Sequence, residues 1–567
     1  MPNIPNIPNK LNKAHKPYWL KLSFIIYHLL FIISMPAHKP YWLKLSFIIY
    51  HLLFIISMPA WAQESDPREL AMRKLIQSTV MINQLYVDTV NIDRQVEDAI
   101  TGMLSKLDPH STYTNAKDTK QLTEPLQGNF EGIGVQFNML EDTLVVIQPV
   151  AKGPSEKVGI LAGDRIISVN DTAIAGVKMS REKIMARLRG PRDTKVKLGV
   201  VRRGISDVLT FIVTRDVIPV TSLDAAYMAA PGIGLIRFSN FSATTHDEVV
   251  KALKDLRKQG MQSLIIDLQG NGGGYLGAAA EIASEFLQRD DLIVYTRGRG
   301  NVSLGDYRAR GGGLFTEGRL VVLVDEYSAS ASEILSGAIQ DHDRGTIIGR
   351  RTFGKGLVQR PIELHDGSMI RLTIARYYTP SGRCIQRPYE KGDAKTYARD
   401  VIDRYNRGEL TNADSIHFPD SLRYKTLKEG RTVYGGGGIM PDIFVPLDTT
   451  RYARLYRELS ARSYINNANL RYMDKNRKAL KKEYPDFETF RAKFQVPQKV
   501  IDEVLAEAAK KDSLKARDDA ELEKTMENMR LILKGLVARD LWDFSEYFQI
   551  IYADDPVVLK ALEVLQQ

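Results

Sequence analysis

The chain has 567 residues, of which 44% are apolar and 26% charged, with 41 Gly and 24 Pro. This ordinary globular composition excludes a collagen, a coiled coil, a disordered chain and a protein with many membrane spans. The single cysteine, Cys384, excludes an intrachain disulfide and a cysteine-based zinc site. The net charge is +10, but it falls to +4 without residues 1–62, which hold six lysines and no acidic residue. No basic stripe with interleaved aromatic residues is present, so a nucleic-acid partner is not expected.

A leader is indicated by a tandem duplication, since residues 14–36 recur without change at 37–59. Each copy joins basic residues to an apolar run of about a dozen residues, which is short for a membrane span. The second copy continues into Ala-Trp-Ala-Gln at 60–63, a small-x-small site typical of secretory signal peptides. We expect export with cleavage after Ala62. The alternative is an inner-membrane anchor formed by the retained leader.

The next part of the chain changes from helical to strand-like patterning. Apolar residues at spacings of three and four predict helix over 66–106, and the Asp108-Pro109 pair ends it. Short apolar runs then predict a compact module over 127–215 with two short helices, near 154–158 and 179–188. Its expected strands are 134–138, 143–149, 165–169, 195–201 and 208–213.

Residues 217–447 alternate strands with helices, which favours βα units and a largely parallel sheet. The expected strands are 234–238, 263–268 and 320–325, and the expected helices lie near 245–259, 275–288 and 331–341. Residues 449–567 are charged and helical. The segment 386–432 is charged and rich in tyrosine, and the sequence indicates no role for it.

A serine at the end of the apolar strand 320–325 is the first candidate for chemistry. Ser330 lies where this strand gives way to a helix, beside free backbone N–H groups and the positive end of the helix dipole. Such groups stabilise an oxyanion. On this segment alone, helix capping is the favoured interpretation of the serines.

Lys355 is the second candidate, because it lies between Gly354 and Gly356. Most lysines are solvated surface charges. A lysine in an apolar pocket has a lowered pKa and can take a proton from a serine. Gln359, four residues further on, is placed to orient the amine.

Two further features bear on this chemistry. The buried strand 263–268 ends in a glycine-rich loop, 270–274, which is either a flexible turn or a loop that brings an N–H close to a substrate carbonyl. His342 is the competing base, with Asp341 and Asp343 beside it. It lies 12 residues beyond Ser330, or about 18 Å along one helix, so a Ser-His pair there is not expected. No histidine spacing indicates a metal site.

In combination and in this order, the segments over residues 65–447 resemble the carboxy-terminal processing proteases, the tail-specific serine peptidases of family S41. The motifs that carry the resemblance are 107–113, 130–135, 267–274, 328–333, 352–359, 372–382 and 438–443.

The resemblance implies a catalytic dyad of Ser330 as nucleophile and Lys355 as base, assisted by Gln359. It implies oxyanion donors at the N–H groups of Ala331 and of a glycine in 272–274, with Gly273 favoured. It also makes 127–215 a PDZ domain, which binds a peptide C-terminus by strand addition. The terminal carboxylate would be held by the loop Gly132, Ile133, Gly134 and Val135. No metal or cofactor is implied.

The expected fold is therefore multidomain α/β: a crotonase-like ββα serine protease core with an inserted PDZ domain and helical N- and C-terminal regions. The expected domains are a signal peptide at 1–62, an N-terminal helical region at 63–126, the PDZ domain at 127–215, the peptidase core at 216–447 and a C-terminal helical region at 448–567.

The expected function is that of an exported, periplasmic serine endopeptidase. It would recognise apolar, unstructured, free C-termini through the PDZ domain, with peptide binding able to gate the dyad, and its helical ends would bind an adaptor or a second copy. The alternatives are a catalytically inactive PDZ scaffold and a Ser-His esterase that depends on His342 or His246.

Overall fold

A computed structural model describes residues 66–567, so the predicted leader and its cleavage site lie outside the described residues. The chain divides into two compact units, Met1–Val96 and Glu97–Gln567.

The predicted helix over 66–106 is interrupted. Helix α3 (Pro67–Leu85) has no buried residue, and α4 (Ile92–Leu104) begins after a break. Valine, aspartate and threonine at 87–89 are poor helix formers, and Asn91 caps α4 by accepting a hydrogen bond from the Arg94 amide at 3.0 Å. The prediction of one continuous helix was therefore wrong in this respect.

The segment predicted as a compact strand module is an antiparallel sheet with its own apolar core. The strand order is β3-β4-β5-β7-β8, with β6 (Thr172–Ala173) paired to β5, and α6 (Pro154–Lys157) and α7 (Arg181–Leu188) are its helices. The strands are β3 (Val135–Leu140), β4 (Thr143–Pro149), β5 (Arg165–Val169), β7 (Lys195–Val201) and β8 (Leu209–Thr214). The chain enters and leaves this module through two strands, β2 (Asn129–Gly132) and β9 (Asp216–Pro219), which pair antiparallel.

The peptidase-like region is built on a six-stranded sheet of order β10-β11-β12-β15-β16-β21. Every neighbouring pair is parallel except β10 with β11, which confirms the predicted βα alternation. The strands are β10 (Leu223–Ala230), β11 (Ile233–Phe238), β12 (Ser263–Asp267), β15 (Arg319–Val324), β16 (Thr346–Gly349) and β21 (Ile443–Phe444).

A second sheet, interleaved with the first along the sequence, carries part of the site. It has the order β1-β18-β13-β14, and β17 also pairs with β18. Its strands are β1 (Thr112–Thr114), β13 (Leu292–Gly298), β14 (Ser303–Arg308), β17 (Leu357–Glu363) and β18 (Met369–Tyr378).

Both faces of the six-stranded sheet are buried, and strand β15 shows how. Leu320, Val322 and Val324 face one apolar cluster, whereas Val321 and Leu323 face another. Successive side chains of a strand point to opposite faces, so an uninterrupted apolar run is what a doubly covered strand needs. Burying each such side chain stabilises the fold by about 1.5–3 kcal/mol.

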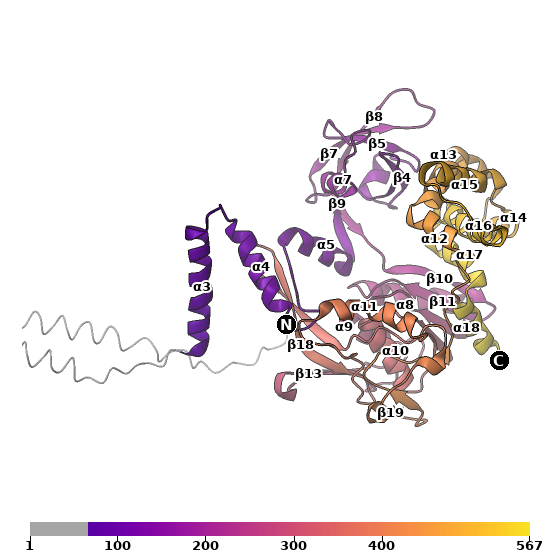
Figure 1. Ribbon diagram of the computed structural model, residues 1–567. Coiled ribbons are helices and arrows are strands. Elements are labelled where there is room, and N and C mark those ends of the chain that lie inside the picture. The colour runs from indigo at the N-terminus through magenta and orange to yellow at the C-terminus, as the bar shows by residue number, and fades with distance from the viewer. Residues whose placement is uncertain (1–65) are drawn as a thin grey trace, which may run out of the picture. The chain divides into compact units, whose positions relative to one another are not determined.

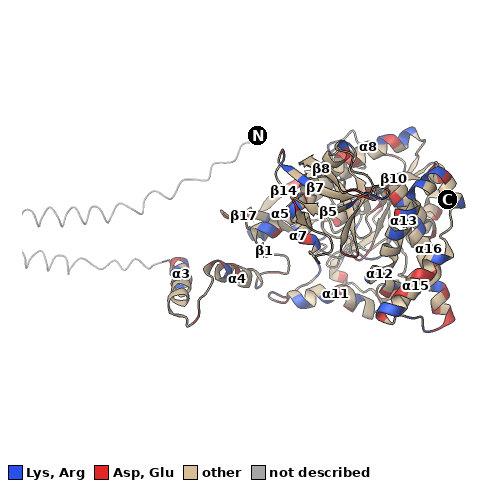
Figure 2. Ribbon diagram, turned by 90° about the horizontal axis from the view of Figure 1, so that it is seen from above, with Lys and Arg blue, Asp and Glu red and all other residues tan. Residues whose placement is uncertain are grey.

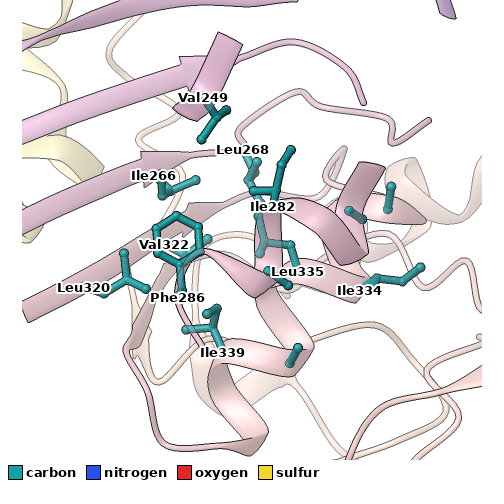
Figure 3. Close-up of a cluster of buried hydrophobic side chains, with 14 of the residues drawn as sticks. Val249, Ile266, Leu268, Ile282, Phe286, Leu320, Val322, Ile334, Leu335 and Ile339 are labelled. Carbon is teal, nitrogen blue, oxygen red and sulfur yellow. The ribbon is translucent and has the colours of Figure 1, made fainter. Parts of the chain in front are cut away.

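Helices α8 (Thr245–Lys258), α9 (Leu276–Ser284) and α10 (Ala331–Asp341) cover the first face. Figure 3 shows Ile266 and Val322 of the sheet among Ile282, Leu335 and Ile339 of these helices. The other face is covered by residues of α17 (Phe544–Ile551) and α18 (Pro556–Gln566), drawn in yellow near β10 and β11 in Figure 1.

The remaining C-terminal helices pack around two clusters of their own. They are α12 (Arg454–Ala461), α13 (Tyr464–Glu483), α14 (Phe487–Lys493), α15 (Gln498–Asp512) and α16 (Asp519–Leu541). Charges of both signs are interspersed on them (Figure 2), as predicted for 449–567. Among residues 66–567, no helix combines the length and the apolarity that crossing a membrane requires.

Candidate active site

Ser330 has an unusual backbone conformation at the start of α10. Its φ is 57° and its ψ is −110°, which is sparsely populated for a residue with a side chain. Such a conformation costs on the order of 1–3 kcal/mol and is held only by its surroundings. The Ser330 amide donates to Glu333 Oε2 at 2.8 Å, and the Tyr377 hydroxyl donates to the Ser330 carbonyl at 3.1 Å. Ser330 does occupy the N-cap position, but ordinary capping needs no such strain.

Glu333 joins the serine to the lysine loop. This fully buried carboxylate accepts hydrogen bonds from the amides of Ser330, Gly354 and Lys355 at 2.8, 2.7 and 2.9 Å. It also accepts one from the Thr352 hydroxyl at 2.6 Å. Burial raises the pKa of Glu333, and the four hydrogen bonds oppose that rise. Sequence reasoning did not single out Glu333, although Ser-x-x-Glu is a recognisable capping-box pattern.

Lys355 has the perturbed titration that a catalytic base needs. Burial, together with the nearby guanidinium of Arg371, lowers its pKa to about 8, although the carboxylates of Glu333 and Asp108 act in the opposite direction. With this pKa, roughly a tenth of the amine is neutral at pH 7, against less than about one part in a thousand for an ordinary lysine. The structure thus supplies an amine that can accept a proton.

One cavity of about 360 Å³ collects most of the predicted catalytic residues. Ser330, Lys355, Gln359 and Gly273 all line it, although they come from four different segments. Its walls are largely apolar and include residues of α5 (Ala116–Gln127) that sequence reasoning missed. The apolar lining consists of Leu122, Leu126, Leu276, Ile334, Leu357, Val358, Pro361 and Met369.

Gln359 points its amide to a polar network beside the lysine. Its Nε2 donates to Thr373 Oγ1 at 3.4 Å, and that hydroxyl donates to Asp108 Oδ1 at 3.0 Å. Asp108 also accepts from the Ser111 hydroxyl at 2.6 Å. The motif around Asp108 therefore contributes to the site, because the Asp108 carboxylate favours the charged form of Lys355 and so raises its pKa.

The two predicted oxyanion donors differ in their surroundings. Ala331 is the first residue of α10, so its N–H has no acceptor within the helix. The Gly273 N–H donates to Asn271 Oδ1 at 2.9 Å and is engaged in this conformation. Gly273 is nevertheless close to Ser330, since a β-carbon added there would lie 2.8 Å from Cβ of Ser330 and 2.9 Å from N of Ala331.

The histidines considered as alternative bases are engaged elsewhere. His342 Nε2 lies 2.7 Å from the Leu292 carbonyl, and His246 Nε2 lies 2.9 Å from Glu285 Oε1. No histidine is among the described residues that line the cavity. Residues 66–567 also contain no group of three or more His, Cys, Asp or Glu side chains arranged to hold a metal ion.

A second cavity of about 340 Å³ lies on the strand module, between β3 and α7. Ile133, Gly134 and Val135 of the predicted carboxylate-binding loop line it, whereas Gly132 does not. Phe544 of α17 also lines this groove, a contribution that the sequence did not reveal. The other lining residues are Phe130, Gln136, Phe137, Arg181, Met185, Leu188 and Arg189.

Comparison with known families matches four parts of the chain. Residues 232–395 match Peptidase family S41, and residues 132–213 match a PDZ domain. Residues 57–119 match the N-terminal domain of the activating protease CtpB, and residues 455–543 match a family of unknown function, DUF8443.

Several curated proteins are similar over most of their length. The carboxy-terminal processing protease CtpB of Bacillus subtilis (strain 168) is 34% identical over 357 residues, which cover 62% of this chain and 72% of that protein. The carboxy-terminal-processing protease of Bartonella bacilliformis is 37% identical over 305 residues, 53% of this chain and 69% of that protein. The solved photosystem II D1 C-terminal processing protease is 26% identical, with a TM-score of 0.33, over 66% of this chain and 92% of that one.

Proposed function

Because the chain belongs to the carboxy-terminal processing proteases, serine peptidases of family S41 that carry a PDZ domain, we propose that it cuts unfolded proteins that end in a free apolar C-terminus, by a Ser330–Lys355 dyad. One observation carries the proposal. The serine and a lysine with a pKa of about 8 line the same largely apolar cavity, and both of their segments hydrogen-bond to Glu333.

In the proposed reaction, the neutral Lys355 amine takes the proton of the Ser330 hydroxyl as its oxygen attacks the scissile carbonyl. The Ala331 N–H stabilises the oxyanion, with Gly273 as second donor once its amide leaves Asn271. The Lys355 ammonium then gives its proton to the leaving amine, and the C–N bond breaks. Lys355 next takes a proton from water as its oxygen attacks the acyl-enzyme carbonyl. The ester C–O bond then breaks, the Lys355 ammonium returns its proton to Ser330 Oγ, and the second product leaves with the dyad restored. Gln359 helps to orient the amine.

Substrate recognition is proposed for the groove between β3 and α7. A peptide C-terminus would add to β3 as an extra strand, with its carboxylate on the amides of the 132–135 loop. The apolar lining of this groove supports a preference for apolar C-terminal residues. Peptide binding there is also proposed to gate the dyad.

We further propose export to the periplasm, with removal of residues 1–62. The mature protein should then begin at Gln63, which mass spectrometry of its N-terminal peptide would reveal. A start upstream of Gln63 in purified membranes would favour the anchored alternative. The exposed apolar side chains of α3 support self-association or adaptor binding through the helical ends, which sedimentation with and without α3 tests.

The deciding experiment is cleavage of an unfolded protein with an apolar C-terminus by residues 63–567. Ser330→Ala and Lys355→Ala should each lower kcat by roughly 10³-fold or more. Amidation of the substrate C-terminus should raise KM, because an amide cannot replace the carboxylate in the loop. Cleavage that survives Lys355→Ala would rule out the dyad.

The inactive scaffold is tested by a fluorophosphonate probe, which reacts only with activated serines. The dyad predicts labelling at Ser330 and no labelling of Lys355→Ala. The Ser-His alternative predicts that labelling is lost when His246 and His342 are both replaced.

A further inference from the structure

The loop that carries Lys355 has no regular secondary structure over residues 351–356. Its backbone groups must therefore find hydrogen-bond partners outside a helix or sheet ladder. On one side, Glu333 accepts the amides of Gly354 and Lys355. The carbonyls of the loop are held from the other side, by the segment 386–432, whose role the sequence did not indicate.

Arg404, on helix α11 (Ala394–Asn406), donates hydrogen bonds to the first two carbonyls of the loop. Its guanidinium donates to the carbonyl of Arg351 at 2.5 Å and to that of Thr352 at 3.0 Å. The residue is 0% exposed. Tyr397 of the same helix packs edge-to-face against Phe353, so α11 lies beside the loop.

Arg387 donates hydrogen bonds to the next two carbonyls of the loop. Its amide donates to the Gly354 carbonyl at 3.0 Å, and its guanidinium donates to the Phe353 carbonyl at 3.3 Å. The guanidinium lies 4.0 Å from the ring centre of Phe353 and 3.8 Å from that of Tyr397, and it pairs with Asp400 at 2.5 Å. The four consecutive carbonyls 351–354 thus accept hydrogen bonds from these two arginines.

Gln386 completes the attachment on the far side of Lys355. Its Oε1 accepts the Gly356 amide at 2.8 Å, and its Nε2 donates to the Tyr397 hydroxyl at 3.2 Å. The lysine therefore projects from a loop whose neighbours on both sides are fixed by residues 386–404.

The burial of Arg404 is costly and calls for a reason. Taking a guanidinium out of water costs several kcal/mol, and well-packed apolar residues often stabilise a core as well as a buried charge does. Arg404 also lies close to a second buried arginine, Arg351, and its carboxylate partner Glu409 is 3.6 Å away. What an apolar side chain cannot supply is a pair of donors aimed at two adjacent carbonyls.

We propose that Arg404, Arg387 and Gln386 are positioning residues that hold the Lys355 amine in its largely apolar pocket and in line with Ser330. The inference rests on the proposed function, in which Lys355 is the base. The family S41 match ends at residue 395, so Gln386 and Arg387 lie within the matched region and Arg404 lies beyond it. Loosening the loop would admit water to the amine and move it away from the serine.

The test is the rate of fluorophosphonate labelling at Ser330 as a function of pH. In the wild type the labelling rate should increase with pH, with a midpoint near pH 8, as Lys355 loses its proton. This rising part of the pH profile is the acidic limb. In Arg404→Met the limb should move to higher pH, and the rate at pH 8 should fall roughly tenfold or more. Arg404→Lys should restore part of the rate, because an ammonium still donates. Arg399→Met, exposed on the same helix, should match the wild type.

Several outcomes are distinguishable. A slower Arg404→Met that keeps the wild-type limb would mean that Arg404 only stabilises the fold, and would overturn the inference. If Arg404→Met does not fold, Gln386→Leu decides: a limb at higher pH supports positioning, and an unmoved limb overturns it. A wild type that does not label, even with a saturating peptide that ends in a free apolar C-terminus, would overturn the dyad itself and the positioning role with it.

Discussion

At the scale of single residues, Lys355 is set between charges of opposite sign. The guanidinium of Arg371 disfavours its ammonium form, whereas the carboxylates of Glu333 and Asp108 favour it. A general base works best when its pKa is close to the working pH. The balance of these neighbours, on top of burial, is what brings the amine into that range.

Removing one of these charges should raise or lower the pKa of Lys355, depending on its sign. Replacing Arg371 by Met removes a like charge, so the pKa of Lys355 should rise and the acidic limb of kcat should move to higher pH. Replacing Asp108 by Asn removes an opposite charge, so the pKa should fall and the limb should move to lower pH. Peptide hydrolysis between pH 6 and pH 10 measures both.

Arg376, exposed on the same strand as Arg371, provides the matched control. Arg376→Met should leave the limb where it is. Shifts of the same sign in Arg371→Met and Asp108→Asn would show that these two charges do not set the pKa of Lys355.

At the scale of elements, the glycine loop after β12 comes within contact of Ser330. Gly273 has a φ of +99°, and an added β-carbon would meet Ser330 and Ala331. A β-carbon added to Gly277, on α9, would meet nothing within 4 Å. Two nearby glycines therefore differ in whether the backbone is crowded against the site.

Gly273→Ala should lower kcat by roughly 10²-fold, because alanine is strained at this φ and its methyl group enters the space of the oxyanion. Gly277→Ala should keep kcat and melt at the same or a slightly higher temperature. Both are measured by hydrolysis and by circular dichroism. An active Gly273→Ala would show that the oxyanion lies elsewhere.

Sequence patterns predicted these elements unevenly. The uninterrupted apolar run of β15 and the helix over 331–341 were predicted almost to the residue, because burial on both faces leaves a clear pattern. Ser330, Lys355 and the glycine loop, which spacing and resemblance singled out, line one cavity. The roles of Glu333, Asp108 and Arg371 were not, since only the fold brings these charges to Lys355.

Helix α11 shows the limit most clearly. Charged segments are usually solvated surface, so Arg404 and Arg387 looked unremarkable in the sequence. Their burial follows from hydrogen bonds to carbonyls of a distant loop, and no local pattern encodes that. The groove residue Phe544 was missed because only the fold brings α17 to the strand module.

At the scale of the whole molecule, the C-terminal helices are part of the peptidase core. Val557, Val558, Ala561 and Leu565 pack against the face of the sheet that α8, α9 and α10 leave open. The Tyr552 hydroxyl bonds to Asp267 at the end of β12, just before the glycine loop. A region expected only to bind partners therefore also completes the core.

Val558→Asp should destabilise the protein by about 3 kcal/mol or more, because it buries an unpaired carboxylate against the sheet. Val558 is 2% exposed, whereas its neighbour Leu559 is 45% exposed. Leu559→Asp should therefore change the free energy of unfolding in urea by less than about 0.5 kcal/mol. Equal stability of the two variants would mean that α18 does not cover the sheet in solution.

The pairing of β2 with β9 has a consequence for how such a chain can be rebuilt. Asn129 lies opposite Pro219, so the chain leaves the core and returns to it within one strand spacing, about 5 Å. A two-residue hairpin turn could replace all the residues between these strands and still join β2 to β9. The PDZ domain can be cut out, or exchanged for another, by joining two adjacent backbone ends. Under the proposed function, recombination at this point would change which peptides are recognised without rebuilding the sheet beneath.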